Sequence, residues 1–319
     1  MPTLSRVKPK LTFNKGIAGF FIFLHLGALL AFFPFAFSWS AVALMLFMHW
    51  LTASIGICFG YHRYLTHRGM DLPKWVANTI VFCGSLACQN GPIKWVAHHR
   101  MHHAGSDTEQ DPHSAKNSLW WPHLGWMIYK HPEFDDDKVI RNYTKDISDN
   151  KFYQFLEKNY IKNQFILGFI FLAIGGLPWV VWGIFLRIVL VYHGTWFVNS
   201  AAHAFGYKNF QLGNDLSTNC WWVAILAYGE GWHNNHHAFP KSAQHGLRPM
   251  EIDITWMAIW TLKKMGLVKN IRVAKVKRST NTTSIDSAFE GEMVRQAAYF
   301  PSAPHSYSVW VVSWFIKII

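Results

Sequence analysis

Three short segments of this sequence are rich in histidine, a side chain that exchanges protons near neutral pH and binds transition metals. The central segment reads HHRMHH at 98–103, and the others read HRYLTH at 62–67 and HNNHH at 233–237. A lone histidine is ordinarily a hydrogen-bonded polar residue, but this density in three distant segments is typical of metal ligands. The sequence therefore predicts a polynuclear metal site that the fold assembles from separate parts of the chain.

The spacing within each segment indicates which imidazoles share a face. His99, His102 and His103 stand at positions i, i+3 and i+4, which lie together on one side of a helix. The histidines of the third segment repeat this spacing. His62 and His67 are five residues apart, which does not match one face of a straight helix, so we expect one of them where its helix frays.

A further pair of candidates lies at the end of a long apolar run. Asn199 and His203 are four residues apart, so both can face the volume that the three segments share. His98 is set aside, because only three of the four central imidazoles fit one helical face. The candidate metal ligands are His62, His67, His99, His102, His103, His203, His233, His236, His237 and Asn199.

Nine imidazoles are too many for one metal ion and suit two. Neutral imidazole binds iron, copper, zinc and nickel, and it leaves the charge of two divalent ions uncompensated. Carboxylates that accept hydrogen bonds from the ligands are therefore expected, and those nearest in sequence are Asp107, Glu109, Asp111 and Glu230. The remaining histidines are interpreted as ordinary polar residues: His25, His49, His113, His123, His131, His193, His245 and His305.

The composition indicates a membrane protein. The 319 residues are 51% apolar and only 15% charged, whereas about a quarter of an ordinary soluble domain is charged. The net charge of +12 comes without a basic stripe or a nucleic-acid motif, so we expect no nucleic-acid partner and attribute the charge to cytoplasmic loops and anionic lipids. The four cysteines lack CxxC spacing and are expected to be reduced.

Four apolar runs are expected to cross the membrane as two helical hairpins, at about residues 16–37, 39–61, 163–177 and 179–202. The basic N-terminus places both chain ends in the cytoplasm by the positive-inside rule. All three histidine segments then fall on the cytoplasmic side. The predicted fold is an all-α integral membrane protein with a cytoplasmic helical cap that carries the metal site.

Some segments outside these runs have separate interpretations. Residues 75–88 are interrupted by polar side chains and are expected to form an interfacial or re-entrant helix. The aspartates at 135–137 are interpreted as a solvated helix start or turn. Arg187, inside the last run, is interpreted as a structurally paired charge, with a role toward substrate as the alternative. Residues 1–275 are expected to form one domain. The tail, 276–319, is atypical; we expect it to lie on the membrane surface or to be disordered, and we assign it no function.

Five segments together resemble the membrane-bound fatty acid desaturases. They are 62–67, 91–103, 111–113, 199–203 and 229–240. The resemblance is to the Δ9, stearoyl-type branch, most closely to its cyanobacterial and plant acyl-lipid members. It covers most of the chain before the tail.

The resemblance implies both a cofactor and a reaction. In that family the nine matching histidines bind two irons (Fe²⁺), and the residue matching Asn199 is associated with one iron through water. The family inserts a cis double bond into a saturated acyl chain, using dioxygen and two electrons. A multi-pass protein of a bacterial inner or thylakoid membrane is implied as well.

Two departures from the family pattern bear on substrate and electron donor. Animal acyl-CoA members carry an Arg-Asp pair where this chain has Ala97 and His98, which favours a lipid-linked acyl chain over a CoA thioester. A fused cytochrome b5 domain is not seen, because its His-Pro-Gly-Gly signature is absent. A separate donor is therefore implied: ferredoxin, or alternatively cytochrome b5.

Other functions remain open at this point. An acyl-CoA Δ9 desaturase is the nearest alternative. A di-iron hydroxylase shares histidine-rich segments of this kind. A membrane metal transporter or metal-binding protein is a more distant alternative, because transporters usually place their ligands near the membrane midplane within broken helices.

Overall fold

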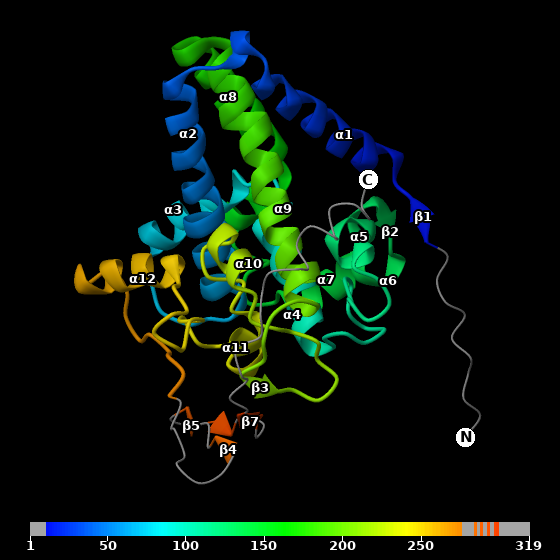
Figure 1. Ribbon diagram of the computed structural model, residues 1–319, viewed down its shortest axis with the longest axis vertical. Coiled ribbons are helices and arrows are strands. Elements are labelled where there is room, and N and C mark those ends of the chain that lie inside the picture. The colour runs from blue at the N-terminus through cyan, green and yellow to red at the C-terminus, as the bar shows by residue number, and fades with distance from the viewer. Residues whose placement is uncertain (1–10, 276–283, 286–287, 290–291, 294–296, 300–319) are drawn as a thin grey trace.

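The computed structural model describes residues 11–275 and four short strands beyond them, at 284–285, 288–289, 292–293 and 297–299 (Figure 1). The chain is mostly helical. The α-helices are α1 (Lys15–Leu29), α2 (Trp39–His49), α3 (Lys74–Ser85), α4 (Pro92–Ala104), α5 (Trp126–Ile128), α6 (Pro132–Asp135), α7 (Asp137–Tyr143), α8 (Lys151–Val180), α9 (Arg187–Ser200), α10 (Trp221–Leu226), α11 (His233–Ala238) and α12 (Ile254–Lys264).

Other helix types and short strands join these helices. The π-helices are η3 (Trp50–Thr66), η4 (Trp121–Gly125) and η5 (Val181–Leu186); the 3₁₀ turns are η1 (Leu30–Phe32), η2 (Pro34–Ala36) and η6 (Ala201–His203). The strands are β1 (Thr12–Phe13), β2 (Tyr129–Lys130), β3 (Phe210–Gln211), β4 (Ser284–Ile285), β5 (Ala288–Phe289), β6 (Glu292–Met293) and β7 (Ala297–Tyr299).

Three continuous helical segments of the described chain are long and apolar enough to cross a membrane: Lys15–Phe32, Trp39–Thr66 and Lys151–His203. Large apolar side chains on them are exposed, such as Phe32 and Phe169. Water would oppose such exposure, whereas lipid accommodates it. The chain is therefore a membrane protein with its apolar helices at one end of the molecule (Figure 1).

The third segment contains a sharp break. It has 53 residues, about 80 Å at 1.5 Å per residue, which is far more than the thickness of a membrane. Gly176 has a φ of 65° and a ψ of −161°, and Pro178 follows it. Glycine tolerates this backbone conformation because it has no Cβ. The helix before the break, α8, packs back against η5 after it.

The lower part of the second segment is π-helical rather than frayed. In η3 the backbone bonds follow the i→i+5 pattern, and the amide of His67 still donates to the carbonyl of His62 over 3.1 Å. This wider turn brings residues five apart onto the same face, and the two imidazole rings lie 4.7 Å apart. His67 is the C-cap residue of η3, so one of the two histidines does lie at the end of its helix, which closes in a hydrogen-bonded wide turn.

Helix α3 packs closely along η3. A Cβ on Gly56 would lie 2.4 Å from the backbone nitrogen of Gly84, so the two helices touch through their backbones. This helix occupies residues 74–85, close to the interfacial helix expected at 75–88, and it is not among the segments able to span a membrane.

Arg187 and the aspartate run at 135–137 both have specific partners in the structure. Arg187 is fully buried and donates hydrogen bonds to Gly183 O, Leu86 O and Gln164 Oε1, as expected for a structurally paired charge. The aspartate run is not simply solvated. Asp136 caps α7, but Asp135 forms an ion pair with Lys94 Nζ over 2.6 Å.

The cap lies below the apolar helices (Figure 1). It contains α4, α11 and the loops around β3, while α12 packs against η3. Beyond residue 275, β7 pairs antiparallel with β3 and with β4, and β5 pairs with β6. The expectations for the rest of the tail, and for the first ten residues, lie outside the described residues.

Candidate metal centre

The nine candidate histidines come together in two groups at the centre of the cap. Within each group, one ring nitrogen per histidine lies within 4.8 Å of every other. The first group takes members from all three histidine segments: His62, His67, His99, His103 and His236. The second group combines the two later segments with η6, the turn that follows α9: His102, His203, His233 and His237.

The ring nitrogens are spaced like ligands of a single ion. In the second group the Nε2–Nε2 distances are 3.3 Å for His102–His237 and 3.0 Å for both His203–His233 and His233–His237. Nitrogens bound to one metal at about 2.1 Å lie roughly 3.0–3.4 Å apart. The first group has the same spacing, for example 3.0 Å between His236 and His103.

The hydrogen bonds made by the Nδ1 atoms of these rings indicate whether each Nε2 carries a hydrogen or a free lone pair. His102 Nδ1 donates to Asp111 over 2.8 Å, and His237 Nδ1 donates to Asp215 over 2.6 Å. In a neutral imidazole whose Nδ1 carries the hydrogen, Nε2 carries only a lone pair. When both rings are neutral, the close Nε2 atoms of His102 and His237 direct two lone pairs at each other, an arrangement that a cation stabilises.

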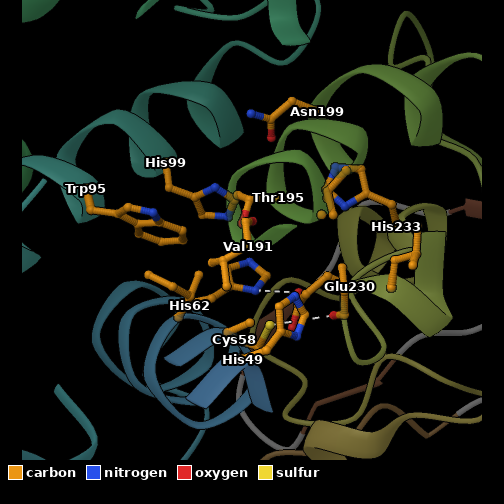
Figure 2. Close-up of a pocket in the computed structure, with 16 residues that line it drawn as sticks. His49, Cys58, His62, Trp95, His99, Val191, Thr195, Asn199, Glu230 and His233 are labelled. Atoms are coloured by element: carbon orange, nitrogen blue, oxygen red, sulfur yellow. Dashed lines mark hydrogen bonds and ion pairs between the residues drawn. The ribbon is translucent and has the colours of Figure 1, made fainter. Parts of the chain in front are cut away.

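Each group is backed by buried carboxylates. In the second group His203 Nδ1 also donates to an aspartate, Asp107, over 2.9 Å. In the first group His62 Nδ1 lies 2.6 Å from Glu230 Oε2 (Figure 2). Such carboxylates orient an imidazole and make it a stronger ligand.

Of the four carboxylates expected from sequence, Asp107, Asp111 and Glu230 contact candidate histidines. Glu109 is exposed at the surface, and Asp215 takes the fourth position. Asp215 precedes the third histidine segment by 18 positions and has no local spacing pattern that could have indicated it.

The electrostatics of the centre favour a bound cation. Burial lowers the pKa of His99, His103, His233 and His236 well below its ordinary value, and repulsion among the imidazoles adds to this effect. The rings are therefore neutral and their lone pairs are free.

The carboxylates behind the rings remain charged. Burial acts to raise the pKa of Asp107, Asp111 and Asp215, but the facing histidines bring it below its ordinary value. With Glu230, whose pKa is likewise lowered by His62 and His245, they carry four negative charges. Two divalent cations would balance these four charges, so the donor set fits a pair of metal ions.

Helix α4, which supplies three of the nine candidate histidines, is held in place by two neighbouring elements. Glu157 on α8 accepts hydrogen bonds from the backbone amides of Ile93 and Lys94 in its first turn, at 2.7 and 3.2 Å. Further along, Arg100 donates to the carbonyls of Leu65 and Thr66 at the end of η3. The central segment is thereby held directly against the first one.

The two asparagines of HNNHH are structural residues that the sequence analysis did not assign. Asn234 Oδ1 accepts from the backbone amide of Phe210 in β3, and its Nδ2 donates back to Phe210 O. Asn235 Nδ2 donates to Glu251 over 2.8 Å, and its Oδ1 accepts from Asn209 and Asn219. These buried amides hold α11, only six residues long, in one orientation.

Arg63, inside the first histidine segment, is also a structural residue. Its guanidinium is fully buried and forms ion pairs with Glu230 and Asp253, both at 2.9 Å, and it donates to Ala243 O. The charge of Arg63 is thus offset by Asp253, and Glu230 stays fixed beside His62.

Three further histidines and Asn199 lie close to the two histidine groups. His245 and His113, interpreted as ordinary, lie against it: His245 is 3.2 Å from Glu230, and the ring of His113 is 4.3 Å from that of His102. His98 faces away, toward Trp126 and Asp135, consistent with setting it aside. Asn199 lines the same cavity as His99 and His233 (Figure 2).

This cavity is narrow and leads from the histidines into the apolar helices. Its free volume is about 40 Å³, and its walls include Ala53, Ile57, Val191 and Val198. Apart from the imidazoles, Asn199, Thr195 and Glu230, the lining is mostly apolar. This narrow channel therefore places apolar side chains directly beside the candidate histidines.

Comparison with known proteins agrees with this description. A family model described as fatty acid desaturase matches residues 36–253. An sn-1 stearoyl-lipid 9-desaturase of Anabaena variabilis is 50% identical over 278 residues, 87% of this chain and all of that protein. A protein of the same description from Synechocystis is 52% identical, covering 83% of this chain and 82% of its own.

The similarity extends to a protein with a different described substrate. An icosanoyl-CoA 5-desaturase of Limnanthes douglasii is 43% identical, covering 78% of this chain and 70% of that one. The chain therefore belongs to the fatty acid desaturase family. It is an oxidoreductase that acts on fatty acyl chains, with a histidine cluster able to bind metal.

Proposed function

We propose that this enzyme inserts a cis double bond at or near carbon 9 of a saturated fatty acyl chain that is linked to a membrane glycerolipid. The observation that carries this proposal is the 50–52% identity to two stearoyl-lipid 9-desaturases over more than four fifths of the chain. The narrow apolar channel beside the histidines supports it, because an unactivated methylene must be held close to the metals.

The ten candidate ligands would hold two irons, five histidines around one and four around the other, with Asn199 nearby. When bound, the irons supply the activation of dioxygen needed to remove two hydrogens from adjacent carbons. The protein's own contribution is positioning. Trp95 and Thr195 line the channel at the level of His99, so the depth of the chain in this channel selects the carbons that react.

We propose that the third apolar segment crosses the membrane twice, with its turn at the Gly176 break, which gives four spans in two hairpins. The cap and both termini would then lie in the cytoplasm of a bacterial inner membrane or on the corresponding side of a thylakoid. Dioxygen is the co-substrate. A separate protein, ferredoxin or alternatively cytochrome b5, would deliver the two electrons.

Expression in a host with a compatible reductant tests the reaction. The cellular lipids are separated by class, and the fatty acids of each are analysed for chain length and double-bond position. We expect a new Δ9 monounsaturated chain in the glycerolipids first. A hydroxylated chain, or a product that appears first in the acyl-CoA pool, would contradict the proposal in its reaction or its carrier.

Replacement of one ligand in each group tests the assignment of the metal centre. His102→Ala and His236→Ala should both abolish the product, because each removes a nitrogen from one of the two groups. Membrane abundance and iron content of the purified proteins are measured in parallel, with His305→Ala in the tail as a control. Unchanged desaturation in either ligand variant would contradict the assignment.

A further inference from the structure

A second, wider cavity lies next to the narrow channel. Its volume is about 680 Å³. Trp95, His99, Thr195 and Asn199 line both spaces. The wide cavity therefore adjoins the narrow channel and reaches His99 itself; we call it the vestibule.

One side of the vestibule is built from segments that can span a membrane. Ile17 and Phe20 of α1 line it, together with Tyr160 and Ile161 of α8. Ile17 and Ile161 are also 37% and 41% exposed. The vestibule thus has walls from two segments that lipid would surround.

The seam between α1 and α9 is closed. The Phe21 ring lies 5.5 Å from that of Tyr192 and 5.3 Å from that of Trp196, in edge-to-face and tilted arrangements. Above them, His25 Nε2 lies within hydrogen-bond distance, 3.1 Å, of His193 Nε2. These contacts hold α1 on α9, which leaves the side of α1 toward α8 as the candidate opening.

Polar groups gather at the part of the vestibule formed by the cap. The ion pair of Lys94 and Asp135 lines it, as do Lys130, His131 and Asn14. The vestibule is therefore amphipathic, with apolar walls from α1 and α8 and a polar rim from the cap. A glycerolipid has the same division between acyl chain and headgroup.

We propose that the gap between α1 and α8 is a lateral portal, through which an acyl chain of a bilayer glycerolipid slides into the vestibule while its headgroup stays at the polar rim. This proposal rests on the proposed function, because only an acyl chain anchored in the bilayer requires a sideways route. A soluble thioester would approach from the aqueous side instead.

Reversible cross-linking of the two helices tests the portal. The variant I17C/I161C is joined in membranes by a bis-maleimide that contains a reducible disulfide; the described native cysteines are all buried. The cross-linked protein should lose desaturation of endogenous glycerolipids about tenfold or more, because the gate is held shut, and recover when the linker is reduced. Each single-cysteine variant with the same reagent is the control.

A fully cross-linked protein that desaturates lipids at the rate of the reduced one would overturn the portal. A loss that reduction does not restore, or that either single-cysteine control shares, would also overturn it. If the untreated wild type forms no unsaturated lipid at all, the proposed function fails, and the following binding measurement decides the portal independently.

Photolabelling measures binding without turnover. The wild-type protein is placed in phosphatidylglycerol nanodiscs doped with a phosphatidylglycerol whose sn-1 stearoyl chain carries a diazirine, and labelled peptides are mapped by mass spectrometry. We expect labels on the vestibule residues Phe20, Tyr160 and Thr195, and reduced labelling of Thr195 in I161W. Labels confined to outward-facing residues such as Phe169 and Leu172 would contradict the portal.

Discussion

Several of the candidate histidines depend on a carboxylate that accepts a hydrogen bond from the other ring nitrogen. The histidines could be identified from sequence because helical spacing is local, and α4 and α11 carry them as expected. Their carboxylate partners were found only partly: Glu230 is three residues from a ligand, whereas Asp215 reaches His237 across a loop. Distant partners of this kind depend on the fold and leave no local pattern.

Asp215→Asn should weaken metal binding more than its small change in shape suggests. The amide keeps the size of the side chain but removes the negative charge that receives the hydrogen of His237 Nδ1. Loss of such a partner typically costs about 10–100-fold in metal affinity. Iron content and affinity of the purified variant are measured, with Glu109→Gln as the exposed control. Equal iron affinity in the two variants would contradict a role for Asp215.

Arg63→Met should destabilise the protein strongly. The change leaves Glu230 and Asp253 as buried charges without their cation, and removal of one partner from a buried ion pair costs about 3–5 kcal/mol. Thermal unfolding in detergent measures the effect. The matched control is Arg68→Met, an exposed side chain paired with Asp146, for which we expect less than about 1 kcal/mol. Similar losses in both variants would contradict this account.

At the scale of elements, the π-helix η3 decides the geometry of the first histidine group. For two histidines five residues apart, straight α-helical geometry predicts that one lies at a frayed end. The apolar run itself was recognised, and its start at Trp39 agrees with the structure. Apolar composition predicts that a helix forms, but it carries no information about a wider helical turn, which packing against α3 favours.

Gly56→Ala should disrupt this packing. The new methyl group would lie 2.4 Å from the backbone of Gly84, which cannot move without displacing α3. We expect a loss of several kcal/mol in stability and of most activity, since His62 lies on the same π-helix. Gly19→Ala on α1 is the matched control, because a Cβ there meets nothing within 4 Å. Normal folding and activity of Gly56→Ala would show that this contact is dispensable.

At the scale of the whole molecule, the division of nine histidines into groups of five and four could not be predicted. The division depends on how α4, α11, η3 and the end of α9 are oriented to one another, and sequence spacing orients residues only within one element. Composition and charge did predict a membrane protein with its histidines gathered in one place. The vestibule was not foreseen either, because its lining comes from α1, α4, α8, α9 and the loops of the cap.

A protein truncated after Lys275 should keep its activity. Both metal-ligand groups, the channel and the vestibule are formed by residues before this point. Fatty acid profiles of cells that express the truncated chain measure this, normalised to protein in the membrane. Truncation after Asp253 is the control that should fail, because it removes α12, whose Ile259 is fully buried in the core. An inactive but stably inserted 1–275 protein would assign the tail a role.

The four carboxylates behind the histidines have a consequence for the cell. A chain without metal packs nine imidazoles around two empty centres, with the carboxylates of Asp107, Asp111, Asp215 and Glu230 behind them, so metal binding supplies part of the free energy of folding. Newly made chains in a cell poor in this metal should therefore be removed by proteolysis before they mature. With iron as the proposed metal, the supply of iron would set the fluidity of the membrane through the amount of enzyme that survives, without any dedicated sensor.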